Sequence, residues 1–316
     1  MNSFSLGKIL VLLIDPDKNV RTTLRGLLGD AGFRNVKEGT CLDDIMCEFQ
    51  ICMPDLIISD ITLPDGSFNN FVFKLRHHEI GTNPFLPIIA TAFSPTADEI
   101  GAVIQAGSDD LIAKPLSGGQ LKQRIKWLIT SRKPFMVTSA YIGPDRRRAS
   151  SDKARNERAL SHTIEVPNVL RAKAVEAHKY KESQHQLQIR ASIDAVNLKK
   201  LYSHVSQITE LVDKIVPSLA FGGPDLATKK LLDRLLYVSE DVARRMVRTK
   251  FDHVSELCQS LIEVTRRILD AGEFPAPKDV DLLKPLSGAI HRGFDESDTD
   301  AAAMAHKISE SVHSKN

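Results

Sequence analysis

Short apolar runs and segments with a helical period alternate along the first 130 residues. Five runs predict strands, at residues 8–14, 35–38, 56–59, 87–91 and 110–113. The first and third runs are apolar at nearly every position, as in strands that are buried on both faces of a parallel sheet. Between the runs, apolar residues spaced three and four apart predict helices near residues 20–31, 41–50, 71–77, 96–106 and 120–129. This alternation predicts an α/β domain with a doubly wound, five-stranded parallel sheet over residues 1–130.

The pattern changes to long helical segments after residue 168. Residues 170–216 and 226–269 predict two long helices that form an all-α hairpin over residues 169–272. Pro217 is expected to end the first helix, and Pro275, Pro277 and Pro285 to interrupt the chain after the second. Residues 273–316 are then a C-terminal tail with one short helix at 300–312.

Each long helix has an apolar seam with additional apolar residues beside it. The seams have spacing like that of a coiled coil and consist of Leu198, Leu201, Val205, Ile208, Val212 and Ile215, and of Val254, Leu257, Leu261, Val264 and Ile268. A single pair of helices would leave the flanking Leu211, Val216, Ile262 and Leu269 exposed. We therefore expect a homodimer in which two hairpins form a four-helix bundle. The alternative is a monomer whose α/β domain or short C-terminal helix covers these side chains.

Residues 131–168 lack a sustained period and carry eight Lys and Arg against four Asp and Glu, which predicts a basic linker. Arg146, Arg147 and Arg148 in this linker could bind phosphate, nucleic acid or an acidic partner, or could be solvated charges. The 316 residues include no apolar run long enough to span a membrane, and the first residues do not have the pattern of a signal peptide. The four cysteines have no metal-binding spacing, so we expect a reduced, cytoplasmic protein.

Polar residues with complementary chemistry follow the predicted strands. Asp15 and Asp17 follow the first strand, Asp60 the third, Thr91 the fourth and Lys114 the fifth. The carboxyl ends of the strands of a doubly wound sheet lie at one edge, so these side chains should meet there. Carboxylates suit Mg²⁺, whereas a hydroxyl and an ammonium group suit a phosphoryl group. The set predicts phosphoryl transfer to a carboxylate, with Asp60 as the nucleophile.

Several segments together resemble the receiver domain of bacterial two-component response regulators: residues 14–15, 54–66, 87–92, 106–110 and 114–115. The resemblance implies a flavodoxin-like fold for residues 1–130. It implies that Asp60 accepts a phosphoryl group from a sensor histidine kinase or a histidine phosphotransfer protein, assisted by Thr91 and Lys114. It also implies an Mg²⁺ site that includes Asp15, Asp60 and the main-chain carbonyl of Thr62. Thr62 and Phe93 occupy positions that tune the lifetime of the phosphorylated state in this family.

Two residues depart from the family pattern. The family usually has two adjacent acids after the first strand, but Pro16 stands at the second place here. Mg²⁺ should therefore bind weakly, or Asp17 should serve as a ligand. The family also favours an aromatic residue as a switch on the fifth strand, where this chain has Leu111.

The second half contains no recognisable catalytic motif, so we expect a signalling protein and not an enzyme. Its helices would act as an interaction module for an unknown protein partner. Its histidines, His204 and His253, are expected to be flanking or surface residues. One alternative is a phosphatase of another receiver that uses Gln207 or Glu210. Another is a transcription regulator that binds DNA through the basic linker. The two helices are too long for a helix-turn-helix, which argues against nucleic-acid binding.

Overall fold

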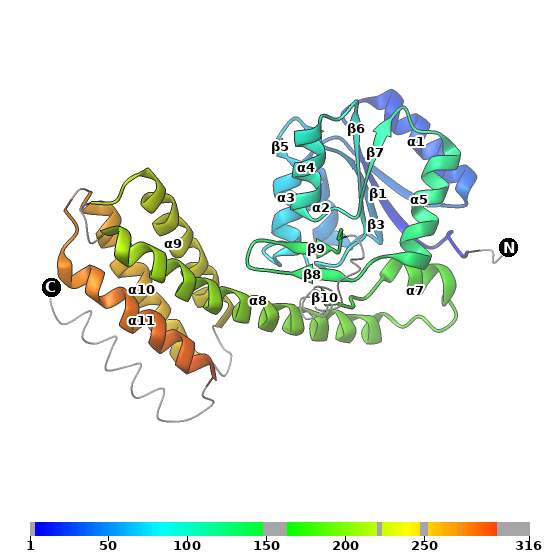
Figure 1. Ribbon diagram of the computed structural model, residues 1–316. Helices are drawn as coiled ribbons and strands as arrows, with labels where there is room; N and C mark the ends of the chain where they lie inside the picture. Colours follow the sequence, from blue (N-terminus) through cyan, green and yellow to red (C-terminus); the bar gives the residue numbers. More distant parts are fainter. Residues whose placement is uncertain (1–3, 148–162, 220–222, 247–251, 273, 296–316) are drawn as a thin grey trace. The chain divides into compact units, whose positions relative to one another are not determined.

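The structure is a computed structural model that describes residues 4–147, 163–219, 223–246, 252–272 and 274–295. The chain divides into two compact units, residues 1–196 and residues 197–316 (Figure 1). Among the helices of the described ranges, none has the length and apolarity needed to cross a membrane. The first unit is larger than the predicted α/β domain because it includes residues that the sequence pattern assigned to the linker and the first long helix.

The first unit is built on the predicted parallel sheet. Its strands are β1 (Leu10–Ile14), β2 (Asn35–Gly39), β3 (Leu56–Asp60), β6 (Ile88–Phe93) and β7 (Asp110–Lys114), in the order β2-β1-β3-β6-β7. A two-stranded ladder of β4 (Thr62–Leu63) and β5 (Gly66–Ser67) follows β3. In terms of the sheet alone the order is 2-1-3-4-5, which is the flavodoxin-like order, so the predicted fold class is confirmed.

Helices cover both faces of this sheet (Figure 1). α1 (Lys18–Ala31) and α5 (Gly118–Ser131) pack on one face, and α2 (Leu42–Ile51), α3 (Phe68–Arg76) and α4 (Ala97–Ala106) pack on the other. Successive side chains of a strand point to opposite faces, so Val11 and Leu13 enter one core while Leu12 and Ile14 enter the other. This explains why the first apolar run shows no alternation.

The described parts of the predicted basic linker, residues 132–147 and 163–168, contain regular structure and belong to the first compact unit. Three short strands, β8 (Phe135–Val137), β9 (Ile142–Pro144) and β10 (Thr163–Ile164), form an antiparallel sheet in the order β10-β8-β9. Phe135, Val137 and Ile142 are buried against Phe85 and the first part of α8 (Glu182–Leu219), a core that also includes Ile189, Ile193 and Val196. Strands of two or three residues are too short to produce a detectable period. We call residues 132–147 and 163–196 the docked segment.

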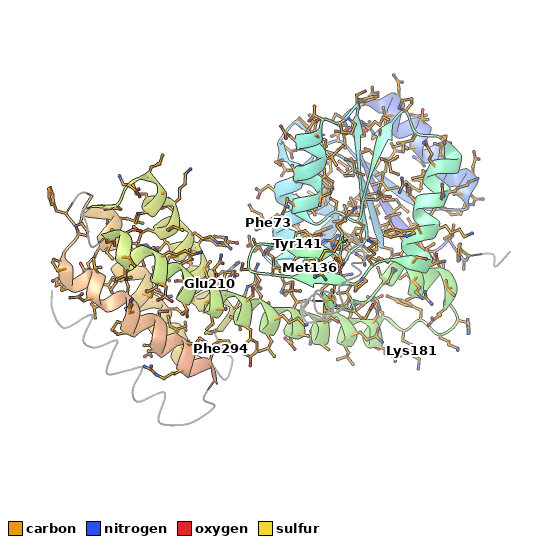
Figure 2. The ribbon with its side chains drawn as sticks, viewed as in Figure 1. Phe73, Met136, Tyr141, Lys181, Glu210 and Phe294 are labelled. Carbon is orange, nitrogen blue, oxygen red and sulfur yellow. The ribbon has the colours of Figure 1, made fainter. Side chains whose placement is uncertain are left out.

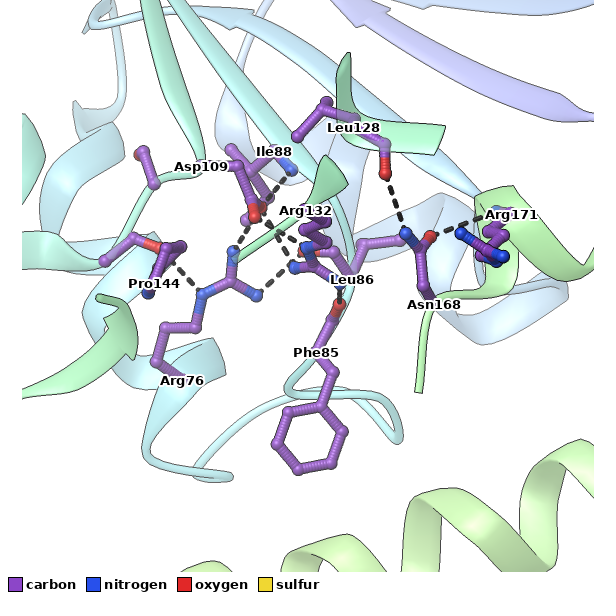
Figure 3. A network of polar contacts seen from close by, with 12 residues as sticks. Arg76, Phe85, Leu86, Ile88, Asp109, Leu128, Arg132, Pro144, Asn168 and Arg171 are labelled. Carbon is purple, nitrogen blue, oxygen red and sulfur yellow. Dashed lines mark hydrogen bonds and ion pairs between the residues drawn. The ribbon is translucent and has the colours of Figure 1, made fainter. Parts of the chain in front are cut away.

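A buried carboxylate connects the docked segment to the parallel sheet (Figure 3). Asp109 accepts hydrogen bonds from the backbone of Ile88 at 2.9 Å, from Arg76 at 3.0 Å and from Arg132 at 2.7 and 3.1 Å. Arg76 also donates to the carbonyl oxygens of Gly107, Pro84 and Leu86. Burial lowers the pKa of Arg76 to about 10, while the Asp109 carboxylate acts against this shift. Every polar group of the network has partners, as burial of charge requires.

Residues 143–147, with the sequence Gly-Pro-Asp-Arg-Arg, have a structural role next to this network. Arg146 donates to the carbonyl oxygens of Ser108 and Asp109 at 2.6 and 2.8 Å. A β-carbon at Gly143 would lie 2.8 Å from the Cα of Gly107, so this close backbone approach requires glycine. The two strands of this region can be located in Figure 2 by the labels of Met136, in β8, and of Tyr141, which immediately precedes β9. Arg147 pairs with Asp145, whereas the predicted contribution of Arg148 lies outside the described residues.

α7 (Val169–Val175) packs against α5 and anchors the docked segment at a second place. Leu170 and Ala174 are buried in the core beneath α1 and α5. Lys173 lies 2.8 Å from Asp55, which also accepts a hydrogen bond from the backbone of Leu10 at 2.9 Å. Burial raises the pKa of Asp55, and the Lys173 ammonium opposes that effect.

The second unit is a bundle of helices within one chain, which corrects the predicted two-helix hairpin. It contains the later part of α8, α9 (Leu226–Met246), α10 (Asp252–Asp270) and α11 (Pro277–Asp295). Pro217 lies inside α8 and Pro285 inside α11, contrary to the prediction. Pro275 lies between α10 and α11 and Pro277 is the first residue of α11, so these two prolines do interrupt the chain after α10 as predicted. A proline is tolerated at the first helical position because the backbone N–H there has no partner in the helix. The predicted helix at 300–312 lies outside the described residues.

The structural reason for predicting a homodimer is wrong. Leu211 is only 6 % exposed and Ile262 only 4 % exposed in the single chain. Val216 and Leu269 also pack against the bundle core, to which α11 contributes Leu283, Leu286 and Ile290. Apart from Leu198, which is 42 % exposed, the residues of the two apolar seams are buried by the chain's own helices and form a bundle core.

His204 is also buried, contrary to the prediction that it lies at the surface. Its Nε2 lies 2.8 Å from Asp241 of α9, and Asp241 accepts a hydrogen bond from Arg245 at 2.8 Å. Burial lowers the pKa of His204, and it lowers the pKa of the neighbouring Lys200 to about 7. This polar cluster joins α8 to α9 inside the bundle. The side chain of His253 is not among those described.

We predict that Asp109→Asn destabilises the first unit by about 3–5 kcal/mol, because it leaves the buried Arg76 and Arg132 without their counter-charge. Urea unfolding of the full chain, followed by fluorescence of the single tryptophan, Trp127, would measure the effect on this core. Asp30→Asn, at an exposed position of α1, is the matched control and should change stability by less than about 0.5 kcal/mol. Equal effects of the two substitutions would contradict a central role for Asp109.

We predict that Leu211→Ala destabilises the bundle by about 2–5 kcal/mol, as expected for a truncated core leucine. Leu226→Ala is the control, since Leu226 is 73 % exposed. Thermal unfolding followed by helical circular dichroism should show a lower transition temperature for the first variant alone. If Leu211→Ala instead changed the oligomeric state without affecting stability, Leu211 would belong to an interface between chains.

Candidate phosphoryl-acceptor site

Two buried carboxylates lie at the carboxyl edge of the parallel sheet. Asp60 is the last residue of β3, and Asp15 directly follows β1. Asp15 is 1 % exposed and Asp60 is 7 % exposed. Asp60 Oδ1 accepts a hydrogen bond from the backbone of Thr62 at 2.6 Å, and Asp15 Oδ1 accepts one from the backbone of Asp17 at 2.9 Å. The backbone that follows each strand thus orients its carboxylate.

Lys114 joins the two carboxylates. It is the last residue of β7, and its ammonium group contacts Oδ2 of both Asp15 and Asp60. The Lys114 side chain is only 2 % exposed, so little water screens these contacts. Two carboxylates and one ammonium group leave one excess negative charge, which favours binding of an additional cation.

Thr91 supplies a hydroxyl group that has no protein partner. It pairs with Asp60 in the register of β3 and β6, and it is 1 % exposed. Its Oγ1 is buried and makes no hydrogen bond within the described part of the chain. An unpaired buried hydroxyl costs free energy, so this atom is suited to donate to a group that arrives beside Asp60. The predicted trio of Asp60, Thr91 and Lys114 therefore lies together at the end of neighbouring strands.

Asp17 caps α1 in this structure. Its carboxylate accepts a hydrogen bond from the backbone of Asn19 at 2.7 Å, and the residue is exposed. Aspartate often takes this capping role at the start of a helix. Asp17 as an Mg²⁺ ligand, the role expected if it replaces the missing second acid, stays a prediction.

Sequence reasoning missed Arg21, which supports the loop after β1. Its guanidinium donates to the carbonyl oxygens of Asp15 at 2.6 Å and Pro16 at 3.1 Å, and its Nε lies 3.5 Å from Glu38. Arg21 lies near the start of α1, only five and six residues after the two carbonyl groups that it binds, and no motif in the sequence singled it out. Arg21 thus holds the backbone of Asp15 in place, and its other partner is the carboxylate of Glu38.

The donor atoms fit a hard divalent cation. Asp15 and Asp60 are adjacent carboxylates, and the main chain of Thr62 is held next to Asp60 by its hydrogen bond. Carboxylate and carbonyl oxygens are the ligands that Mg²⁺ prefers. No group of three or more Asp, Glu, His or Cys side chains is arranged for metal binding in the described ranges. The site therefore offers two anionic ligands, Asp15 and Asp60.

The rim of the site is partly apolar. Phe93 is 62 % exposed, and its ring centre lies 4.7 Å from the Lys114 ammonium. An open hollow of about 210 Å³ lies next to this pair and is lined by α1 and by the residues after β7, namely Asn19, Val20, Thr23, Leu24, Pro115 and Leu116. Leu111, at the position of the missing aromatic switch, is half-buried against the core beneath α3 and α4.

Comparison with curated proteins reveals relatives that match part of this chain. The KDP operon transcriptional regulatory protein KdpE of Escherichia coli is 35 % identical over 117 residues, which cover 37 % of this chain and 49 % of that protein. The transcriptional regulatory protein GltR of Pseudomonas aeruginosa is 34 % identical over 122 residues, which cover 38 % of this chain and 48 % of that protein. The chain thus spans about half the length of the curated relatives it matches.

Solved structures of similar sequence include a putative response regulator from Chloroflexus aurantiacus, with 28 % identity, a TM-score of 0.34 and coverage of 38 % of this chain and 96 % of that one. Another is the receiver domain of a sensor histidine kinase from Pseudomonas aeruginosa, with 25 % identity, a TM-score of 0.33 and coverage of 38 % and 94 %. Residues 11–126 match the family profile described as the response regulator receiver domain. Residues 11–126 of this chain are therefore the receiver domain of a two-component response regulator.

Proposed function

We propose that this protein is a phosphorylated response regulator in which Asp60 is the sole phosphoryl acceptor. The observation that carries the proposal is the arrangement around Asp60. Lys114 contacts its carboxylate, and the unpaired Thr91 hydroxyl stands at the neighbouring strand position. A nucleophile, a cation and a free donor are what transfer to a carboxylate requires.

In the proposed reaction, a carboxylate oxygen of Asp60 attacks the phosphorus of a phosphohistidine. The new O–P bond forms as the P–N bond breaks, and the imidazole leaves and takes up a proton. Lys114 moves its contact from the carboxylate to a phosphoryl oxygen, and Thr91 donates its hydroxyl hydrogen to another. A bound Mg²⁺, held by Asp15, Asp60 and the Thr62 carbonyl, would neutralise charge on the transferred oxygens.

The phosphoryl donor would be a sensor histidine kinase or a histidine phosphotransfer protein in the cytoplasm. The apolar hollow beside Lys114 supports this assignment, because it can take up an apolar side chain of a partner next to the acceptor. We propose that the helical bundle is the output module and binds another protein. Its organisation as a separate compact unit supports that role. The function would be signalling and not enzymatic. We do not include a homodimer in this proposal, because the bundle core is covered by helices of the same chain.

Neither alternative function gains support from a contact in the structure. Gln207, a candidate for a phosphatase, accepts a hydrogen bond from Arg234 at 2.9 Å. Arg146, a candidate for binding DNA, donates to main-chain carbonyls of the receiver, and Arg147 pairs with Asp145. These side chains already have structural partners.

We predict that acetyl phosphate with Mg²⁺ phosphorylates the full chain at Asp60 alone. Borohydride trapping followed by peptide mass mapping identifies the modified residue, and Asp60→Asn should abolish modification while preserving the fold. Asp17→Asn is the matched control and should leave phosphorylation intact, since asparagine also caps helices. Trapping of Asp15 or Asp17 in place of Asp60 would refute the assignment.

We also predict that Pro16→Asp strengthens Mg²⁺ binding, because it adds a third carboxylate beside Asp15 and Asp60. Titration calorimetry should show a lower Kd, by about tenfold if the added ligand contributes about 1.4 kcal/mol. Asp17→Asn should leave the Kd unchanged, because the Asp17 carboxylate caps α1. A large loss of affinity in Asp17→Asn would show that Asp17 is a ligand after all.

A further inference from the structure

Strand β3 connects the proposed acceptor to the docked segment. Asp60 ends this strand, and Asp55 directly precedes it. Asp55 is 2 % exposed and is paired with Lys173 of α7 at 2.8 Å. A five-residue strand spans roughly 16 Å. One end of β3 thus carries the acceptor, and the other end carries a buried ion pair to a helix outside the family-matched region.

Strand β7 repeats this arrangement. Lys114 ends β7 at the acceptor site, and Asp109 directly precedes the strand. Asp109 is 1 % exposed and binds Arg132, and the carbonyl oxygens of Ser108 and Asp109 accept from Arg146. Two strands that bear essential groups of the site are therefore both held at their amino ends by the docked segment.

The docked segment also forms the start of α8. Phe135, Val137 and Ile142 share a core with Ile189, Ile193 and Val196 of α8. α8 then continues without interruption to Leu219, so its later residues, among them Val205 and Ile208, belong to the bundle core. A displacement of β8, β9 or α7 would act directly on the packing of α8.

We propose that phosphorylation of Asp60 is read out at the amino edge of the sheet, through β3 and β7, by the docked segment and α8. This regulatory inference rests on the proposed function of Asp60. The buried ion pairs of Asp55 and Asp109 are the mechanical connections, since packed strands and salt-bridge networks transmit displacements between sites.

The contacts also define the direction of the effect. In this structure Lys114 is bound to both carboxylates, which is the arrangement before transfer. Phosphorylation draws Lys114 away from the Asp60 carboxylate toward the phosphoryl oxygens and so perturbs the end of β7. The docked segment makes its ion pairs with Asp55 and Asp109 in this same arrangement, so we expect phosphorylation to weaken its docking. Coupling between two sites is reciprocal. A substitution that weakens the docking should therefore favour the phosphorylated state by the same factor by which phosphorylation weakens the docking.

The test uses the full chain with Mg²⁺ and beryllium fluoride, which imitates a phosphoryl group on aspartate. Fluorine NMR establishes whether beryllium fluoride is bound, and Asp60→Asn shows whether binding depends on the acceptor. Hydrogen–deuterium exchange then measures the exchange rates of the backbone amides of β8, β9 and α7 in the same samples. We expect faster exchange in these three elements on binding, and no change in Asp60→Asn.

Lys173→Met tests reciprocity, because methionine retains the aliphatic stem and removes the ion pair with Asp55. It should tighten beryllium fluoride binding by about fivefold, the lower end of ordinary coupling between sites. Lys179→Met, at an exposed position after α7, is the matched control and should bind like the unaltered chain. Trp127 fluorescence verifies that each variant is folded before the comparison.

Each outcome bears on a defined part of the proposal. Binding that depends on Asp60 with unchanged or slower exchange in the docked segment would overturn the readout at the amino edge and leave the proposed function intact. Absence of binding to the unaltered, folded chain would refute the proposed function and this inference with it. If Lys173→Met cannot fold, exchange in the unaltered chain alone decides between the outcomes.

Discussion

The carboxylate of Asp109 organises the first unit because it balances two buried guanidinium groups at once. Arg76 comes from α3 and Arg132 from the residue after α5, and both depend on this one anion. A buried guanidinium without a counter-charge would be strongly destabilising. The network therefore requires that β7, α3 and the start of the docked segment assemble together. It also explains why residues beyond the family-matched region form part of the same compact unit.

The acceptor site follows the same physical rule at the opposite edge of the sheet. Lys114 contacts both Asp15 and Asp60, so the two buried carboxylates share one counter-charge. The Thr91 hydroxyl is the exception, since it lacks a partner among the described residues. The charged groups of the acceptor site are therefore paired, whereas the neutral Thr91 donor beside the nucleophile is not.

The predicted α/β domain and its site could be inferred from the sequence because both depend on local patterns. A strand buried on both faces has a continuous apolar run, and the residue that follows it must lie at the carboxyl edge of the sheet. This reasoning located Asp15, Asp60, Thr91 and Lys114 without knowledge of their contacts. It did not foresee that Asp17 caps α1, since capping depends on the backbone conformation after Pro16.

Long-range packing decided the rest. Strands as short as β8 and β9 have no period of their own and form only because the receiver offers Phe85 and Asp109 as partners. The apolar stripes of α8 and α10 indicated that something must cover them, but a second chain and α11 of the same chain satisfy that requirement equally well. The sequence by itself determined which side chains are apolar and which strand ends carry the chemistry. Only the tertiary structure decided what each buried face and each buried charge would contact, because those partners are distant along the chain.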